Sequence, residues 1–249
     1  MTRGVYTAAA GMLANQAAQD TIAQNLANAN TVGYKEDVPG FESLLSQPVS
    51  RLSPADRLSI GTMGSGAGLR EVTTNFSQGG FQQSGNPLDV ALTGDGALVI
   101  QTPTGPRLSR DGSLSLSARG VLVQANTGQA VLSDRNTVLS VPANAKNIVI
   151  SASGEIAADG VNLGRIQTAS LSPLVNPMKV GDNQYTVSSL RPASPAATIR
   201  QGFLETSNVS IVKEMVSMIS IMRAYETNQK MLQAEDDTTG KATNEVGKL

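Results

Sequence analysis

The sequence predicts an α+β fold, in which a discontinuous helical domain is made from both ends of the chain and an all-β domain is inserted between them. Residues 5–29 and 209–233 each carry an apolar stripe at helical spacing. The glycine-rich residues between them follow the pattern of short strands separated by turns. A chain that begins and ends with such helices is expected to pair its termini, with each other or with neighbouring subunits. This arrangement favours an assembly protein over a catalyst.

The first helix is expected to begin near Val5. Its two heptad positions carry Val5, Met12, Gln19 and Leu26, and Ala8, Asn15, Ile22 and Ala29. The polar residues Asn15 and Gln19 interrupt the stripe. Between Arg3 and Lys35 only Asp20 is charged, whereas a solvated helix of this length normally carries several charges. The segment is therefore either a buried core helix or, as we favour, a helix packed among others in a polymer.

Residues 46–70 are interpreted as a flexible or extended connector, because prolines and glycines are scattered there among serines and threonines. The run 61–68 is rich in glycine but lacks the Gly-Lys-Ser/Thr ending of a phosphate loop. Nucleotide binding is therefore not predicted. With its flanks, the connecting segment covers residues 36–71 and follows the N-terminal part of the helical domain at residues 1–35.

Residues 72–203 are assigned to the all-β domain. Asp-Gly and Asn-Thr-Gly turn signals separate short apolar runs at intervals of about 8–12 residues, which is typical of a sandwich or an irregular barrel. The expected strands are 88–93, 97–102, 114–117, 121–124, 138–141, 148–151, 165–171 and 184–188.

The last helix belongs to residues 204–249, and Asn208 or Ser210 is expected to cap its N-terminus. Its apolar side chains recur at a, d and e positions, which makes a band wider than a strict coiled-coil seam. They are Ile211, Val212, Met215, Met218, Ile219, Met222, Tyr225 and Leu232. The periodicity is lost after Asp237, so the tail is expected to fray.

Cysteine, histidine and tryptophan are absent from the chain. This composition excludes disulfides, Cys/His metal sites and His-dependent nucleophile systems. The aspartates that precede glycines are interpreted as turn residues and not as catalytic acids. We therefore expect no enzymatic activity, no catalytic residues, and no cofactor or metal. The formal net charge of −1 offers no footprint for nucleic acid.

The N-terminus has no apolar core of the kind found in a secretory signal, and no stretch approaches the roughly 18–20 apolar residues of a membrane span. The chain is therefore expected to be cytoplasmic, or to leave the cell by a route that needs no cleaved signal.

Three groups of segments resemble the flagellar basal-body rod and hook protein family. Residues 11–13 and 24–35 resemble its N-terminal signature, roughly Asn-Asn-Leu-Ala-Asn-x-x-Thr-x-Gly-aromatic-Lys, with Gln24 in place of the first asparagine. Its C-terminal signature is matched by 205–209, 214–216 and 223–228, and the core of its rod proteins by 85–92 and 110–113. The chain departs from the family at Ala97-Leu98, where an aromatic pair is usual, and at Leu108-Ser109, where Tyr-Thr is usual.

The resemblance implies a structural subunit of the bacterial flagellar rod, which assembles helically through its terminal helices, crosses the periplasm and transmits torque. The implied partners are copies of itself, other rod proteins and the flagellar type III export apparatus. The chain length and the ending at 236–242 favour the proximal-rod (FlgF) type over the distal-rod (FlgG) type. A non-flagellar β-rich binding module with a helical oligomerisation stalk is the other alternative. The termini are expected to be disordered before assembly.

The predicted assembly interface combines the coiled-coil-like stripes with residues of the two terminal signatures. The stripes contribute Val5, Met12, Ile22, Leu26, Ile211, Val212, Met215, Met218, Ile219, Met222, Tyr225 and Leu232. The resemblance adds Asn25, Asn28, Gly33 and Asn208. Asn15 and Gln19 either set the register with neighbouring helices or face a wet channel.

Overall fold

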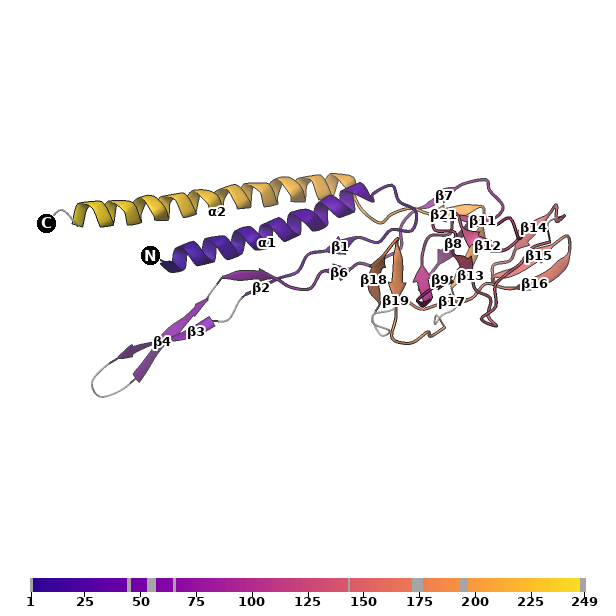
Figure 1. Cartoon of the computed structure of the whole chain (residues 1–249), viewed down its shortest axis with the longest axis horizontal. Helices are drawn as coiled ribbons and strands as arrows, with labels where there is room; N and C mark the ends of the chain where they lie inside the picture. Colours follow the sequence, from indigo (N-terminus) through magenta and orange to yellow (C-terminus); the bar gives the residue numbers. More distant parts are fainter. Residues whose placement is uncertain are drawn as a thin grey trace. The chain divides into compact units, whose positions relative to one another are not determined.

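The computed structural model describes residues 2–43, 46–52, 57–64, 66–142, 144–171, 177–192 and 197–246. A helix stands at each end of the chain and strands lie between them, which confirms the predicted α+β class with an inserted β domain (Figure 1). The chain forms two compact units. The helical unit contains Met1–Ala27, Asp37–Thr73 and Ser210–Leu249, and the β unit contains Asn28–Glu36 and Thr74–Val209. The segment predicted to be a connector thus lies mostly within the helical unit.

The helical unit is centred on α1 (Thr2–Ala27) and α2 (Ile211–Val246), which pack against each other (Figure 1). The chain between them forms successive two-stranded pairs, β1 with β6, β2 with β5 and β3 with β4. Their bounds are β1 (Asp37–Val38), β2 (Phe41–Ser43), β3 (Ser46–Leu52), β4 (Arg57–Gly64), β5 (Ala67–Leu69) and β6 (Thr73–Thr74). The extended form expected for this segment is therefore achieved by strand pairing, and β5 contacts α1.

Helix α2 continues well past the point where the sequence predicts fraying. The hydroxyls of Thr238, Thr239 and Thr243 each donate to the backbone carbonyl four residues earlier. These bonds satisfy the threonine hydroxyls within the helix itself, so the helical conformation of this segment leaves none of the three hydroxyls unpaired. The expectation of a frayed tail is wrong for the described residues up to Val246.

The β unit is built around an eight-stranded sheet in the order β11-β12-β13-β9-β10-β19-β18, with β17 also paired to β9. These strands are β9 (Ala97–Thr102), β10 (Gly105–Ser109), β11 (Leu114–Leu116), β12 (Leu122–Gln124), β13 (Ala130–Val131), β17 (Thr168–Ala169), β18 (Met178–Gly181) and β19 (Gln184–Thr186). A separate sheet contains β14 (Ile148–Ile150), β15 (Glu155–Ala158) and β16 (Val161–Arg165). Two further pairs join β20 (Thr198–Gln201) to β8 (Val90–Thr93) and β21 (Phe203–Glu205) to β7 (Phe81–Gln83).

Strand β9 begins with a continuous apolar run, residues 97–100, because both of its faces are buried there. Leu98 and Ile100 enter one apolar cluster, and Ala97 and Val99 enter a second cluster. A strand covered on both faces needs no polar alternation. The prediction for residues 97–102 is confirmed to the residue.

The turn predictions had mixed outcomes. Asp159-Gly160 forms the tight turn between β15 and β16, with φ of 49° and 84°. Asp111-Gly112 forms no turn. Gly112 instead accepts a hydrogen bond from the Val90 amide, and an added Cβ would strike the Val90 carbonyl. Residues 138–141, predicted to be a strand, make only isolated bridges.

Candidate assembly interface

Helix α1 presents a small or polar residue to α2 at every seventh position. A Cβ added to Gly4 would lie 2.7 Å from Glu235 Oε1, and one added to Gly11 would lie 2.9 Å from Asn228 Nδ2. Ala18 is fully buried. Two heptads after Gly11, Asn25 Nδ2 donates to Glu214 Oε2 at 3.3 Å. We call the row Gly4, Gly11, Ala18 and Asn25 the small-residue seam.

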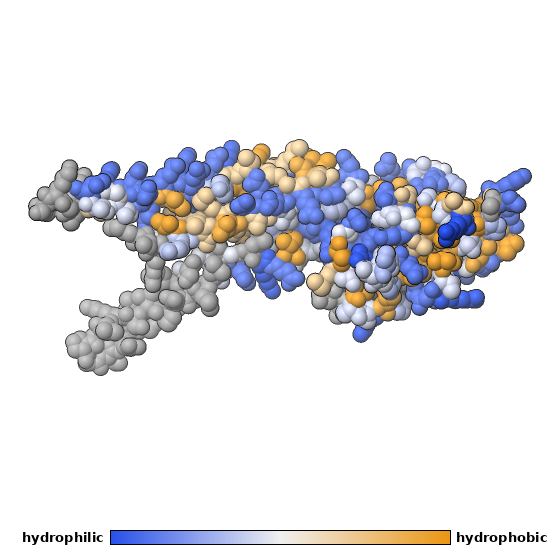
Figure 2. All heavy atoms as spheres, in the orientation of Figure 1, coloured by the Kyte–Doolittle hydropathy of each residue, from blue (hydrophilic) through white to orange (hydrophobic). Residues whose placement is uncertain are grey.

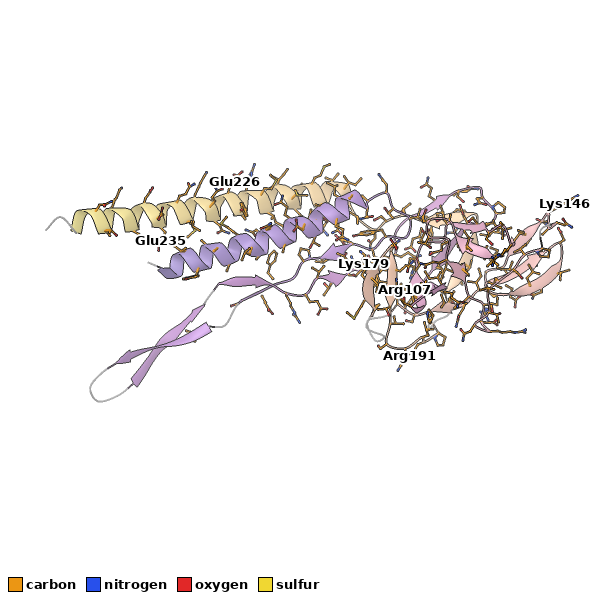
Figure 3. All side chains as sticks on the ribbon, viewed as in Figure 1. Arg107, Lys146, Lys179, Arg191, Glu226 and Glu235 are labelled. Carbon is orange, nitrogen blue, oxygen red and sulfur yellow. The ribbon has the colours of Figure 1, made fainter. Side chains whose placement is uncertain are left out.

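The α2 partners of this seam are also spaced in heptads, and they run in the opposite direction. Glu235, Asn228 and Glu214 face successively later residues of α1, so the two helices are antiparallel and pair in layers. In Figure 3, Glu235 lies on the α1 side of α2 and Glu226 points away from it. The absence of large side chains on the α1 seam allows the helix backbones to approach closely.

The predicted α1 stripe lies beside this seam. Val5, Met12 and Leu26 are half-buried, as are the polar Asn15 and Gln19, while Ile22 is buried. The small-residue seam, which faces α2, therefore lies one residue before the row Val5, Met12, Gln19 and Leu26. A search for large apolar residues does not detect a seam made of glycine and alanine.

The α2 stripe divides into two faces. Met218, Tyr225 and Leu232 are half-buried. The other predicted residues, and the unpredicted Val216, are exposed, and Val212 reaches 74%. We call the exposed group the α2 patch: Ile211, Val212, Met215, Val216, Ile219 and Met222. Figure 2 shows apolar side chains gathered where α2 begins. Contiguous exposure of apolar side chains marks a binding surface.

The signature asparagines make contacts within the chain. Asn25 Oδ1 accepts from the Asp37 amide at 2.9 Å, and Asn25 Nδ2 donates to the Asp37 carbonyl at 2.8 Å. This two-point contact fixes the end of α1 to the strand that follows it within the helical unit. Asn28 Oδ1 accepts from the Thr31 hydroxyl at 3.1 Å, in the turn after α1. Asn25 and Asn28 therefore shape the chain locally.

Asn208 joins three segments of the β unit just before α2. Its Oδ1 accepts from the Glu36 amide at 2.7 Å, and its Nδ2 donates to the carbonyls of Asn75 at 2.8 Å and Ser77 at 3.1 Å. It is therefore an intrachain clip and not the helix cap that its position before α2 suggests. The Glu214 amide donates to the Ser210 carbonyl, which is the first intrahelical bond and places Ser210, the other predicted cap residue, at the N-cap position of α2.

Gly33 has its position in the N-terminal signature because the chain is too close to Arg110 for a side chain there. Its φ is +66°, in the left-handed region, and an added Cβ would lie 2.4 Å from the Arg110 carbonyl oxygen. The Gly33 amide donates to the Glu205 carbonyl at 2.8 Å. Gly33 therefore brings the start and the end of the β unit into direct contact.

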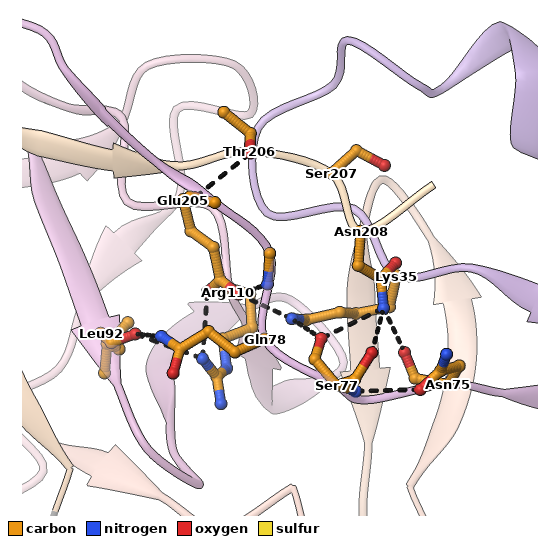
Figure 4. Close-up of polar contacts among 12 residues, drawn as sticks. Lys35, Asn75, Ser77, Gln78, Leu92, Arg110, Glu205, Thr206, Ser207 and Asn208 are labelled. Atoms are coloured by element: carbon orange, nitrogen blue, oxygen red, sulfur yellow. Dashed lines mark hydrogen bonds and ion pairs between the residues drawn. The ribbon is translucent and has the colours of Figure 1, made fainter. Parts of the chain in front are cut away.

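A buried cluster of three charges lies next to this contact (Figure 4). The Glu205 side chain is 0% exposed, and its Oε1 accepts from Lys35 Nζ at 2.7 Å. Its Oε2 accepts from Arg110 Nη1 at 3.0 Å. The Gly79 amide also donates to Oε1, at 2.9 Å, and Lys35 Nζ donates to the Ser77 carbonyl at 2.8 Å. One carboxylate thus serves two cations, one from each of two distant segments.

Burial lowers the pKa of the Lys35 ammonium below its ordinary value of 10.5, against the opposing attraction of Glu205, while the nearby Arg110 charge lowers it further. This cluster was not predicted from the sequence. Its signal was that Lys35, Arg110 and Glu205 each lie in a different one of the three signatures. Those signatures therefore meet at one place in the β unit.

Comparison with known proteins gives matches along most of the chain. The family described as "Flagella basal body rod protein" matches residues 5–35, the "Flagellar hook protein FlgE/F/G D1 domain" matches 91–158, and the "Flagellar basal body rod FlgEFG protein C-terminal" matches 200–245. The rod protein FlgG of Borreliella burgdorferi is 34% identical over 98% of both chains. The chain belongs to the flagellar basal-body rod protein family. It is a structural rod protein of the flagellar basal body, in a family of structural proteins and not of enzymes.

Two further relatives of this rod protein show how broad the likeness is. The hook-basal body complex protein FlhO of Bacillus subtilis is 30% identical, and the rod protein FlgF of Caulobacter vibrioides is 29% identical, each over 100% of both chains. Relatives of the FlgF and FlgG types thus both match at full length, which assigns the family without choosing between the types.

The described part of this rod protein contains no helix long and apolar enough to cross a membrane. Within the same residues, no group of three acidic, cysteine or histidine side chains could hold a metal ion.

Proposed function

We propose that this rod protein assembles helically by packing the α2 patch against neighbouring subunits, both copies of itself and other rod proteins. The observation that carries the proposal is the row of large apolar side chains exposed on α2. Burying each such side chain contributes roughly 1.5–3 kcal/mol. A patch of six therefore offers enough apolar surface to hold a helical element in a polymer.

The other predicted interface residues on α2 and in the two signatures stabilise the fold of the subunit. Met218, Tyr225 and Leu232 are half-buried in the helical unit. Asn25, Asn28, Gly33 and Asn208 shape the two ends of the β unit and the end of α1, through the contacts described above. Their role in assembly is therefore to fix the form of the subunit, while the α2 patch makes contact with the neighbour.

The proposal includes the position and the route of the protein. The assembled rod crosses the periplasm and transmits torque, and the chain reaches it through the flagellar export apparatus without a cleaved signal. The family relationship supports the location in the basal body, and the length of the chain supports the proximal rod. Labelling this subunit in isolated basal bodies tests the position. Its retention inside cells that lack a working flagellar export apparatus tests the route, and secretion from those cells would contradict it.

The assembly claim is tested with Met215→Asp and Ile219→Asp, each of which places a charge in the α2 patch. Both variants should fail to form rods, because a buried unpaired carboxylate opposes association. The melting transition of the β unit should stay unchanged. The matched control is Gln229→Asp, an equally charged substitution at an exposed polar position of α2. Rods of normal yield from either patch variant would refute the proposal.

A further inference from the structure

A second, smaller apolar patch lies on α1. It consists of Tyr6 and Leu13, which are 73% and 68% exposed and are seven residues apart. The α2 patch contains a pair with the same spacing, Val212 and Ile219. The helical unit therefore carries two exposed apolar pairs with equal spacing, one on each helix.

The two pairs point away from each other. Tyr6 and Leu13 each come two positions after a glycine of the small-residue seam, which is about 200° around the helix at roughly 100° per residue. Val212 and Ile219 each come two positions before a seam position of α2, which is again about 200°. Each pair therefore lies on the outer face of its own helix, directly away from the partner helix.

The two pairs also lie at different heights along the helix axis. In the seam, Gly11 lies opposite Asn228, so Leu13 is level with Glu226. Val212 lies two heptads before Glu226, a distance of about 21 Å at roughly 1.5 Å per residue. The same offset separates Tyr6 from Ile219. One axial shift therefore brings both α1 side chains onto both α2 side chains at once.

The outer face of α1 has the composition of a covered surface. The sequence contains no charged residue between Arg3 and Asp20, and the neighbours of the exposed pair include the small residues Ala9 and Ala10. An exposed helix normally carries charges, while the buried centre of an interface is depleted of them. The absence of charge around Tyr6 and Leu13 therefore indicates a protein partner with a matching apolar ridge.

We propose that the α2 patch of one copy packs on Tyr6 and Leu13 of a second copy of this chain, displaced by about two heptads, or roughly 21 Å, along the helix axis. The proposal rests on the assembly proposed above and specifies which surface receives the α2 patch. Because the two surfaces differ, the contact is head-to-tail, and repeating it produces an open helical filament in place of a closed dimer.

The test uses the absence of cysteine from the chain. One preparation carries Leu13→Cys and another carries Val212→Cys, and the two are mixed, assembled and oxidised. Disulfide-linked dimers should form in rods but not in dilute monomer, because the two Cα atoms must come within about 7 Å. Tyr6→Cys mixed with Ile219→Cys is an independent pair at the same offset. Leu13→Cys mixed with Glu226→Cys is the matched control, because these exposed positions are level with each other.

Crosslinking of either two-heptad pair, with no crosslinking of the level pair, supports the proposal. Rods that crosslink through Leu13→Cys and Glu226→Cys, or that form normally with neither two-heptad pair linked, would overturn the offset while leaving assembly through α2 intact. Failure of the unmodified chain to join rods would instead refute the proposed function. The two claims are therefore distinguished by one set of samples.

Discussion

Substitutions in the buried charge cluster are expected to differ in how much stability they cost. Replacing Glu205 with Gln removes the carboxylate that contacts both cations, Lys35 at 2.7 Å and Arg110 at 3.0 Å. Both cations would then stay buried without a counter-charge in this cluster. Removing one partner of a buried ion pair costs about 3–5 kcal/mol, and here one substitution affects two pairs. We expect the free energy of unfolding of the β unit to fall by at least that amount.

Lys35→Met is the variant whose loss of stability is compared with that of Glu205→Gln. It leaves Glu205 and Arg110 as a balanced pair and removes a cation whose burial already lowers its pKa. Lys35→Met removes two hydrogen bonds, to the Ser77 carbonyl and to Glu205 Oε1, at about 1 kcal/mol each, and the relief of desolvation offsets part of that. The expected loss for Lys35→Met is therefore about 1–2 kcal/mol, below that of Glu205→Gln.

The assay is thermal unfolding of the full chain by calorimetry, following the transition of the β unit. For a body of this size, about 3–5 kcal/mol corresponds to a decrease in Tm of roughly 6–20 °C. Equal decreases for the two variants would contradict the central role of Glu205 in pairing with both cations. A decrease of less than about 2 °C for Glu205→Gln would refute the reasoning altogether.

Three further predictions concern single positions. Gly33→Ala should lower the free energy of unfolding, measured by urea titration, by at least about 2 kcal/mol, because φ is +66° and the backbone of Arg110 blocks the added Cβ. Gly128→Ala, at φ +68° with open space around the added Cβ, should lower it by only about 1 kcal/mol. Equal losses for the two variants would exclude the clash. Because the folded pKa of Lys35 is below 10.5, the unfolded chain binds more protons between these two pKa values, so stability should rise with pH across that window. This part of the slope should be missing from Lys35→Met in parallel melts. Ala18→Leu should overpack the seam at a fully buried position, which should lower the stability of the helical unit by about 1–3 kcal/mol and reduce the rod yield. Ala23→Leu, on the exposed face of the same helix, should reduce the rod yield less. The reverse order would contradict the assignment of the seam.

The fold class and the two terminal helices could be predicted because their signals are local. Depletion of charge marks α1, and apolar periodicity marks both α1 and α2, without knowledge of their partners. The register between them could not be predicted in the same way. The search for periodicity selects large residues such as Met12, whereas close helix packing depends on Gly11 and Ala18, which have no apolar signal. The extra length of α2 was missed because threonine hydroxyls satisfied within the helix produce no stripe.

The β unit shows a similar division. Strand β9 is a continuous apolar run and was predicted to the residue, while β10 carries Gly105-Pro106 and was missed. Strands that are short and polar on one face depend on their neighbours for stability, so the sequence alone does not distinguish them from loops.

The polar residues of the signatures were the hardest to interpret. The resemblance placed Asn25 and Asn208 in the assembly interface, yet the structure shows both in contacts within the chain. An asparagine amide pairs equally well with a backbone of its own chain or of a neighbour, and nothing in the sequence distinguishes the two cases. The α2 patch was predicted more securely, because large apolar side chains exposed on a helix need a partner wherever they occur.

The contact between Gly33 and Glu205 has a consequence for how such proteins change in size. The amide of Gly33 donates to the Glu205 carbonyl, so this hydrogen bond holds together the two ends of the chain segment that forms the β unit. Segments inserted into the chain between Gly33 and Glu205, or removed from it, can leave this hydrogen bond and the separation of the two residues unchanged. The β body can therefore be enlarged, trimmed or exchanged during evolution or by design while the terminal helices keep their own sequence and spacing.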